Sequence, residues 1–133
     1  MKIALLSQMG FTGKIPRNHP NMRTEFAQMC ALNADHYPLY DVDKITEGYD
    51  HIILMIPKTQ KDRDSLYNID IVKKARRVGK YVWFMQEGPN WIFQDLPIHQ
   101  QFWHYNVLME VDGILTENRS DIPYFRGLVG GDK

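Results

Sequence analysis

The sequence has few cysteines, no excess of charge of either sign and no long apolar run at its start, as is typical of an ordinary globular protein. It contains one cysteine, Cys30, so an intramolecular disulfide is excluded and a cytoplasmic protein is the simplest expectation. Sixteen Lys and Arg residues balance sixteen Asp and Glu residues, so no net positive charge favours general binding to nucleic acid. The first apolar run, Ile3 to Leu6, is too short for a signal-peptide core or a membrane span.

What the sequence does contain is a regular alternation of apolar runs and helix-like patterns along 133 residues, which suggests one domain over 1–133. Continuous apolar runs predict strands that are buried on both faces. The predicted strands span 2–7, 51–57, 81–86 and 113–116, with a weaker one over 36–42. Amphipathic spacing predicts helices over 22–34, 69–79, 97–112 and 121–128. We expect Asp121 to cap the last helix, Gly127 to end it, and Gly79 to follow the second helix as its C′ glycine.

This order of elements predicts an α/β fold with a mainly parallel sheet of about five strands and helices on both faces. Right-handed crossovers place the carboxyl ends of the parallel strands on one edge of the sheet. Ligands of such sheets bind in the crevice at that edge, near the point where the strand order reverses. Functional side chains are therefore expected just after the strands end.

Polar residues follow all four strong strands at this predicted edge. The residues singled out there are Gln86, Glu87, Gly88 and Trp91 after one strand, and Glu117 and Asn118 after the last. Solvent exposure and turn chemistry explain any one such loop equally well. Four polar strand ends on one edge nevertheless favour a binding site. Trp91 either offers a stacking platform to a ligand ring or caps the core.

The stretch "GFTGK" after the first strand resembles a phosphate-binding loop only in part. Two residues separate Gly10 from Gly13, and no hydroxyl residue follows Lys14, so the Walker pattern is excluded. What remains is a flexible glycine loop in which Lys14 and Arg17 precede a helix whose N-terminus favours an anion. Arg23, in the first turn of that helix, either points back to the crevice or is a solvated surface charge.

Other chemistries have less support from the sequence. The five histidines show no metal-ligand spacing with one another or with Cys30, so no metal site is expected. Ser7, Thr12 and Ser65 have no recognisable base nearby, which leaves a hydrolase triad without support. The basic run over 73–77 is interpreted as a solvated helix face, with a DNA-contacting patch as the less favoured alternative.

Three longer stretches, over 10–39, 86–118 and 121–128, together resemble the N-terminal, acceptor-side domain of GT-B-type glycosyltransferases. The resemblance is greatest to the enzymes of this type that bacteriophages encode. It implies a three-layer Rossmann-like domain that forms the N-terminal half of a two-domain enzyme. The C-terminal half would bind the nucleotide-sugar donor, and the chain ends about where the family crosses into that half. The chain would then be inactive without its donor-binding partner domain.

The resemblance also implies roles for individual residues. Glu87 and Glu117 would be the carboxylates available as the general base that inverting members use on the acceptor hydroxyl. Each is as readily explained as a loop residue that binds neighbouring backbone N–H groups or caps a helix. The substrate contacts would come from Gly10, Gly13, Lys14, Arg17, Arg23, Gln86, Gly88, Trp91 and Asn118.

Two functions follow from these expectations. The first is the acceptor-side domain of a sugar transferase, with a nucleotide-sugar donor, no covalently bound cofactor and an acceptor such as a modified DNA base or a glycan. The alternative is a stand-alone, non-enzymatic module that binds a nucleotide or a protein partner at the same crevice. A chain without its partner domain would also expose an apolar face, which would allow self-association.

Overall fold

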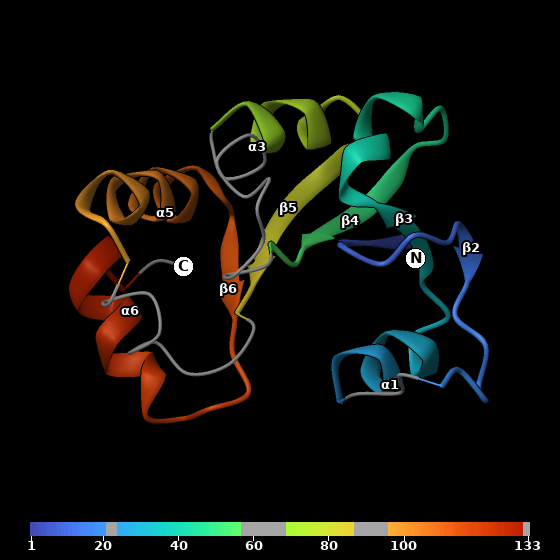
Figure 1. Cartoon of the computed structure of the whole chain (residues 1–133), viewed down its shortest axis with the longest axis horizontal. Helices are drawn as coiled ribbons and strands as arrows, with labels where there is room; N and C mark the ends of the chain where they lie inside the picture. The colour runs from blue at the N-terminus through green and yellow to red at the C-terminus, as the bar shows by residue number, and fades with distance from the viewer. Residues whose placement is uncertain (21–23, 57–68, 87–95, 132–133) are drawn as a thin grey trace.

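The computed structural model describes residues 1–20, 24–56, 69–86 and 96–131, and a six-stranded sheet forms its centre (Figure 1). The strands are β1 (Ile3–Ser7), β2 (Gly13–Lys14), β3 (Asp35–Pro38), β4 (Tyr49–Leu54), β5 (Gly79–Met85) and β6 (Gly113–Leu115). They lie in the order β2-β3-β1-β4-β5-β6, and only β2 pairs antiparallel with its neighbour. The predictions of an α/β fold and of a mainly parallel sheet are therefore confirmed.

Helices connect the parallel strands and follow the last one. They are α1 (Thr24–Ala31), the 3-10 helix η1 (Leu39–Lys44), α3 (Ile69–Arg76), α5 (Ile98–Glu110) and α6 (Asp121–Val129). The helix α1 lies on the opposite side of the sheet from α3 (Figure 1). The longest of them, α5, has 13 residues, and no helix in the described ranges is long and apolar enough to cross a bilayer.

Two apolar clusters explain why the strands read as continuous apolar runs. Ala4 and Leu6 of β1 belong to a cluster that includes residues of η1, α3 and α5. Their neighbours Ile3 and Leu5 belong to a second cluster, which includes residues of α1. Because successive side chains of a strand point to opposite faces, a strand covered on both faces needs an apolar residue at every position.

The weak strand predicted over 36–42 is shorter than expected. β3 ends at Pro38, and Leu39 begins η1. Proline has no N–H to donate to a sheet ladder, so a strand that reaches it has reason to stop. The short strand β2 was expected as a loop, and it pairs with β3 through Gly13 opposite His36 and Lys14 opposite Asp35.

Three predicted helix boundaries are wrong. Gly79 is the first residue of β5 rather than a helix C′ residue, and a Cβ atom there would lie 2.7 Å from Cγ1 of Ile52. The Ile52 side chain that packs against this position therefore explains the glycine. Asp121 is the first residue of α6 and Ser120 is its N-cap, while the helix continues through Gly127. Gly130, with a φ of 89°, follows the helix as its C-cap.

Candidate functional site

A buried serine and histidine meet where β1 ends beside β3. Oγ of Ser7 lies 2.6 Å from Nε2 of His36, and Nδ1 of the same ring lies 2.8 Å from the carbonyl oxygen of Phe11. A carbonyl can only accept, so Nδ1 carries the ring proton and the Ser7 hydroxyl donates to Nε2. The expectation that Ser7 has no base nearby is wrong, because the pairing of β1 with β3 brings together residues 29 positions apart.

This pair has the contacts of a structural network rather than of an exposed nucleophile. Ser7 and His36 are both fully buried, and the N–H of Met9 donates to the Ser7 hydroxyl at 3.2 Å. The ring of Phe11 stacks on His36 with centroids 4.2 Å apart. Burial lowers the pKa of His36, although its hydrogen bond to the Phe11 carbonyl acts in the opposite direction. A neutral His36 thus holds the loop after β1 against the sheet.

The lysine expected to face an anion is engaged at the start of β3. Nζ of Lys14 lies 2.9 Å from Oδ1 of Asp35 and donates to the carbonyl of Asn33 at 2.7 Å. The Tyr49 hydroxyl also donates to Asp35, at 2.7 Å. Burial would raise the pKa of Asp35, but these hydrogen bonds outweigh it and lower that pKa. A ligand contact by Lys14 stays a prediction, and such a contact would compete with this ion pair.

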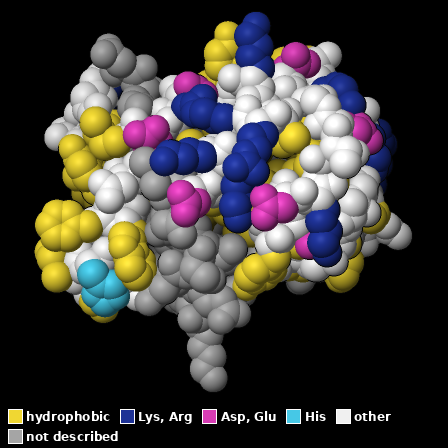
Figure 2. Space-filling view, turned by 90° about the horizontal axis from the view of Figure 1, so that it is seen from above, with side chains coloured by type: hydrophobic (Ala, Val, Ile, Leu, Met, Phe, Trp, Pro, Cys, Tyr) yellow, Lys and Arg dark blue, Asp and Glu magenta, His cyan; other side chains and the backbone are white. Residues whose placement is uncertain are grey.

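Two of the four basic residues over 73–77, in and just after α3, pair with carboxylates. Lys74 pairs with Asp43 at 3.1 Å, and Arg76 pairs with Asp112 at 2.9 Å. Figure 2 shows Lys and Arg side chains interleaved with Asp and Glu over one face of the molecule. Interleaved charge of both signs gives little attraction for a phosphate backbone, so the interpretation of this run as a solvated helix face is favoured over DNA contact.

An apolar groove of about 510 Å³ lies between α1 and the carboxyl ends of β5 and β6. We call it the edge groove, and its lining residues are Gln28, Met29, Ala31, Leu32, Met85, Leu115, Thr116 and Glu117. Glu117 is the one charged residue among them. The predicted carboxylate therefore lies at the rim of a real hollow, at the end of the last strand.

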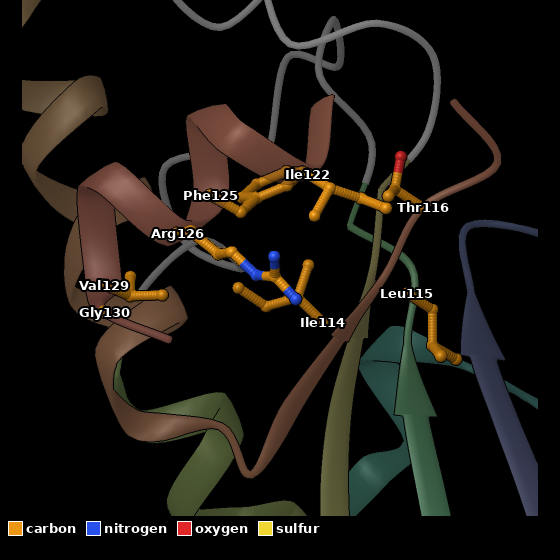
Figure 3. Close-up of a pocket in the computed structure, with 8 residues that line it drawn as sticks. All are labelled: Ile114, Leu115, Thr116, Ile122, Phe125, Arg126, Val129 and Gly130. Carbon is orange, nitrogen blue, oxygen red and sulfur yellow. The ribbon is translucent and has the colours of Figure 1, made fainter. Parts of the chain in front are cut away.

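A second groove of about 310 Å³ lies on the other side of β6, against α6 (Figure 3). Its lining residues are Ile114, Leu115, Thr116, Ile122, Phe125, Arg126, Val129 and Gly130. Arg126 extends from α6 toward Ile114, across the floor of this groove (Figure 3). Leu115 and Thr116 line both grooves, so the end of β6 separates a groove with a carboxylate from a groove with a guanidinium.

Arg17 lies in a different hollow from Glu117. A depression of about 580 Å³ on another side of α1 is lined by Ile15, Arg17, Ala27, Cys30, Ala31 and Asn33. The predicted residues Arg17 and Glu117 are thus not brought into one shared groove. Cys30 is half-buried, and its thiol donates to the carbonyl of Ile15 at 3.4 Å, in agreement with a packed thiol.

Gln86, the residue after β5, is buried with its side-chain amide unpaired. It is 2% exposed, and neither polar atom of its amide has a hydrogen-bond partner among the described residues. Its backbone N–H donates to the carbonyl of Leu115 at 2.8 Å, which places it at the carboxyl edge beside β6. A buried amide without a partner costs free energy, so Gln86 is a candidate for a contact beyond those that the described residues supply.

The remaining predicted residues are placed as follows. Gly10 is exposed after β1, and Gly13 lies in β2 with a φ of 120°. Asn118 forms a local turn after β6, since its N–H donates to Oγ1 of Thr116 and its Oδ1 accepts from Ser120. The predictions for Arg23, Glu87, Gly88 and Trp91 fall outside the described residues.

Comparisons of the chain with family models, with curated proteins and with solved structures give no match. Within the described residues, no group of three or more His, Cys, Asp or Glu side chains is arranged to hold a metal ion. The edge groove and the buried amide of Gln86 are the features of the described residues that bear on function.

Proposed function

We propose that the chain is the acceptor-side domain of a GT-B-type glycosyltransferase of the kind that bacteriophages encode. A second domain would hold the nucleotide-sugar donor. Numbered along the chain, the five parallel strands have the order 2-1-3-4-5, which is the flavodoxin-like order of doubly wound folds and fits the alternative of a binding module as well as it fits the transferase. The two apolar clusters, one on each face of the sheet, fit the three layers of such a fold.

The composition of the edge groove carries the proposal. Its floor is apolar, Glu117 lies at its rim, and the lining residues within the described ranges include no Lys, Arg or His. Apolar side chains pack against the ring of a sugar or a base, and a carboxylate accepts the proton of a hydroxyl. Among the described lining residues, a diphosphate would meet the negative charge of Glu117 and no cation. The groove therefore suits a neutral acceptor with a hydroxyl group, and leaves the donor to the other domain.

The reaction follows from these roles. Glu117 accepts the proton of the acceptor hydroxyl as that oxygen attacks the anomeric carbon of the donor sugar. The bond from that carbon to the diphosphate breaks, and the nucleoside diphosphate leaves with the bonding electrons. The hydroxyl of Thr116, which lines the same groove, is placed to orient the acceptor. This scheme is that of an inverting transferase, in which one general base acts on the acceptor.

Gln86 favours the second candidate function, a stand-alone module that binds a nucleotide. A planar amide offers one acceptor oxygen and two donor N–H groups side by side, which is the pattern that pairs with the edge of a base. Because both polar atoms of the amide are fully buried, a base would pair with them only after the residues that cover Gln86 move aside, and no transfer would follow.

Heteronuclear NMR titration of the isolated chain separates the two functions. Neutral saccharides and nucleosides are expected to shift the amide signals of Met85, Leu115 and Glu117, whereas uridine diphosphate and UDP-glucose leave them unchanged. Glu117→Gln should keep this binding, and Glu47→Gln serves as the matched control on the opposite part of the surface. Diphosphate compounds that shift the edge-groove signals while neutral compounds do not would overturn the acceptor assignment.

A further inference from the structure

The helix α5 is apolar on two sides, although only one of them is buried. His104, Val107 and Leu108 form its buried side. On the outward side Ile98, Phe102, Tyr105 and Met109 are 67%, 60%, 37% and 41% exposed. We call these four residues the α5 seam. Figure 2 shows hydrophobic side chains gathered around a histidine at the end of the molecule where α5 lies in Figure 1.

The seam is a concentration of exposed apolar surface rather than a scatter of single residues. Nine large hydrophobic residues are exposed in the described parts of the chain, and four of them lie on this one helix. Single exposed apolar residues are normal, whereas a contiguous patch marks a site of interaction. The spacing of the four residues, at intervals of four, three and four, puts them on one stripe of the helix.

The chemistry of the seam selects another helix as its occupant. Intervals of three and four are those of the a and d positions at which two helices pack knobs into holes. A bilayer surface is disfavoured because α5 contains no Lys or Arg to meet anionic lipids. Its one carboxylate, Glu110, lies at the C-terminal end, so the seam itself offers no charge to a charged partner surface.

We propose that a second copy of this chain covers the seam, with the two α5 helices antiparallel about a two-fold axis. Such an interface is isologous, so one patch must fit itself. Antiparallel pairing places Phe102 opposite Tyr105 at the centre and Ile98 opposite Met109 at each end. It also separates the two Glu110 carboxylates by the length of the helix, whereas parallel pairing would put them side by side.

Polar residues beside the seam fit the same arrangement. His99 and Asn106 flank it at positions that face each other across an antiparallel helix pair, and both are exposed in the single chain. The antiparallel arrangement also places the positive N-terminal end of each helix macrodipole beside the negative C-terminal end of the other, which is the favourable orientation.

The exposed area predicts a weak dimer. A fully buried aromatic side chain covers roughly 150–250 Å², so four large side chains that are about half exposed supply a few hundred Å² per copy. A standard stable interface covers about 800 Å² per partner. The dimer should therefore form reversibly and only at high protein concentration. This inference does not depend on the proposed transferase function.

Sedimentation velocity of the chain over a wide concentration range tests the proposal. The wild-type chain is expected to pass from monomer to dimer, and Phe102→Glu should weaken the dimer roughly tenfold or more. Tyr40→Glu is the matched control, because Tyr40 is 51% exposed in η1 and lies outside α5. A wild-type chain that stays monomeric at the highest concentration, or equal effects of the two substitutions, would overturn the proposal.

A cysteine experiment tests the orientation of the helices. In a Cys30→Ser background, a mixture of His99→Cys and Asn106→Cys chains should form disulfides mainly between one chain of each kind. Disulfides mainly between two His99→Cys chains would indicate parallel helices and contradict the two-fold model. Co-sedimentation of a monomeric wild-type chain with phosphatidylglycerol vesicles, lost in Phe102→Glu, would assign the seam to a membrane and overturn the proposal as well.

Discussion

The two halves of the sheet differ in whether their buried polar side chains have hydrogen-bond partners among the described residues. At β1 and β3, Ser7, His36 and the Phe11 carbonyl form one hydrogen-bonded chain. At β5 and β6, the amide of Gln86 has no partner among the described residues. Oδ2 of Asp121, at the start of α6, is equally buried and equally without a partner there. Both grooves that meet at the end of β6 lie on this second side.

This difference suggests that the two sides of the sheet have different roles, one in stability and one in binding. A buried polar group with all its partners contributes to the specific packing of the fold, and a buried polar group without them costs free energy. Each such group in a native structure calls for an explanation, and a contact that a ligand or partner supplies is one. On this reasoning the β1–β3 side is the structural half of the sheet, and the β5–β6 side is where binding is expected.

The largest expected effect is that of His36→Ala on the structural half. The substitution removes a ring that stacks on Phe11 and leaves the Ser7 hydroxyl and the Phe11 carbonyl buried without their partner. We expect a loss of about 2–4 kcal/mol in the free energy of unfolding, measured by urea denaturation. Arg119→Ala, at an exposed position before α6, is the control and should change stability by less than about 0.5 kcal/mol. A loss below about 1 kcal/mol for His36→Ala would contradict the structural role of this network.

On the β5–β6 side, replacing a buried polar side chain should raise the free energy of unfolding rather than lower it. Gln86→Met replaces a buried amide by an apolar side chain of similar length, and so removes an unpaired donor and acceptor. We expect the free energy of unfolding to rise by about 1–2 kcal/mol in the absence of ligand. Ser7→Ala is the comparison, because it removes a paired group and should destabilise. If Gln86→Met also destabilises, the contrast between the two halves fails.

Much of this fold can be predicted from the sequence because a strand that is buried on both faces has a simple pattern. Each strong strand is a run of consecutive apolar residues, and each was predicted within a few residues of its position. β2 was not predicted, because two residues carry no periodicity and its pairing depends on a partner strand elsewhere in the chain. A helix end is predicted at Gly127, but α6 continues through it to Val129, and the positive φ that favours a glycine is at Gly130.

The site was predictable only where it depends on strand ends. Glu117 follows a strand and lies at the rim of the edge groove, as a carboxyl-edge residue should. The pairing of Ser7 with His36 was missed, because it arises from the order of β3 beside β1 and no local spacing reveals that order. Arg17 follows the glycine loop in the sequence, but the chain turns back as β2 and carries it to another hollow.

A smaller effect is expected from pH on the structural half. Burial holds the pKa of His36 below its ordinary value, so the unfolded chain binds a proton more readily than the folded one. The stability that depends on neutral His36 is therefore fully present above the unfolded pKa of about 6.5 and is lost as the pH falls toward the lower folded pKa. Urea denaturation between neutral and mildly acidic pH should show this slope, and His36→Gln should flatten it. An unchanged slope in His36→Gln would assign the effect to another group.

The smallest expected effect concerns Lys14, at the edge of the structural half. Its ion pair with Asp35 is partly exposed, since the Lys14 side chain is 58% exposed, so Lys14→Met should lower the free energy of unfolding by less than about 1 kcal/mol at neutral pH.

The pKa of Asp35 should rise in Lys14→Met, because one of the hydrogen bonds that lower it is gone. Stability that depends on ionised Asp35 is present above its unfolded pKa and is lost as the pH falls through its folded pKa. Acid denaturation of Lys14→Met should therefore begin at a higher pH than that of the wild type, and Lys44→Met, at another exposed ion pair, is the control. If Lys14→Met instead leaves acid denaturation unchanged and abolishes binding of an anionic ligand, Lys14 belongs to the binding half despite its position beside β3.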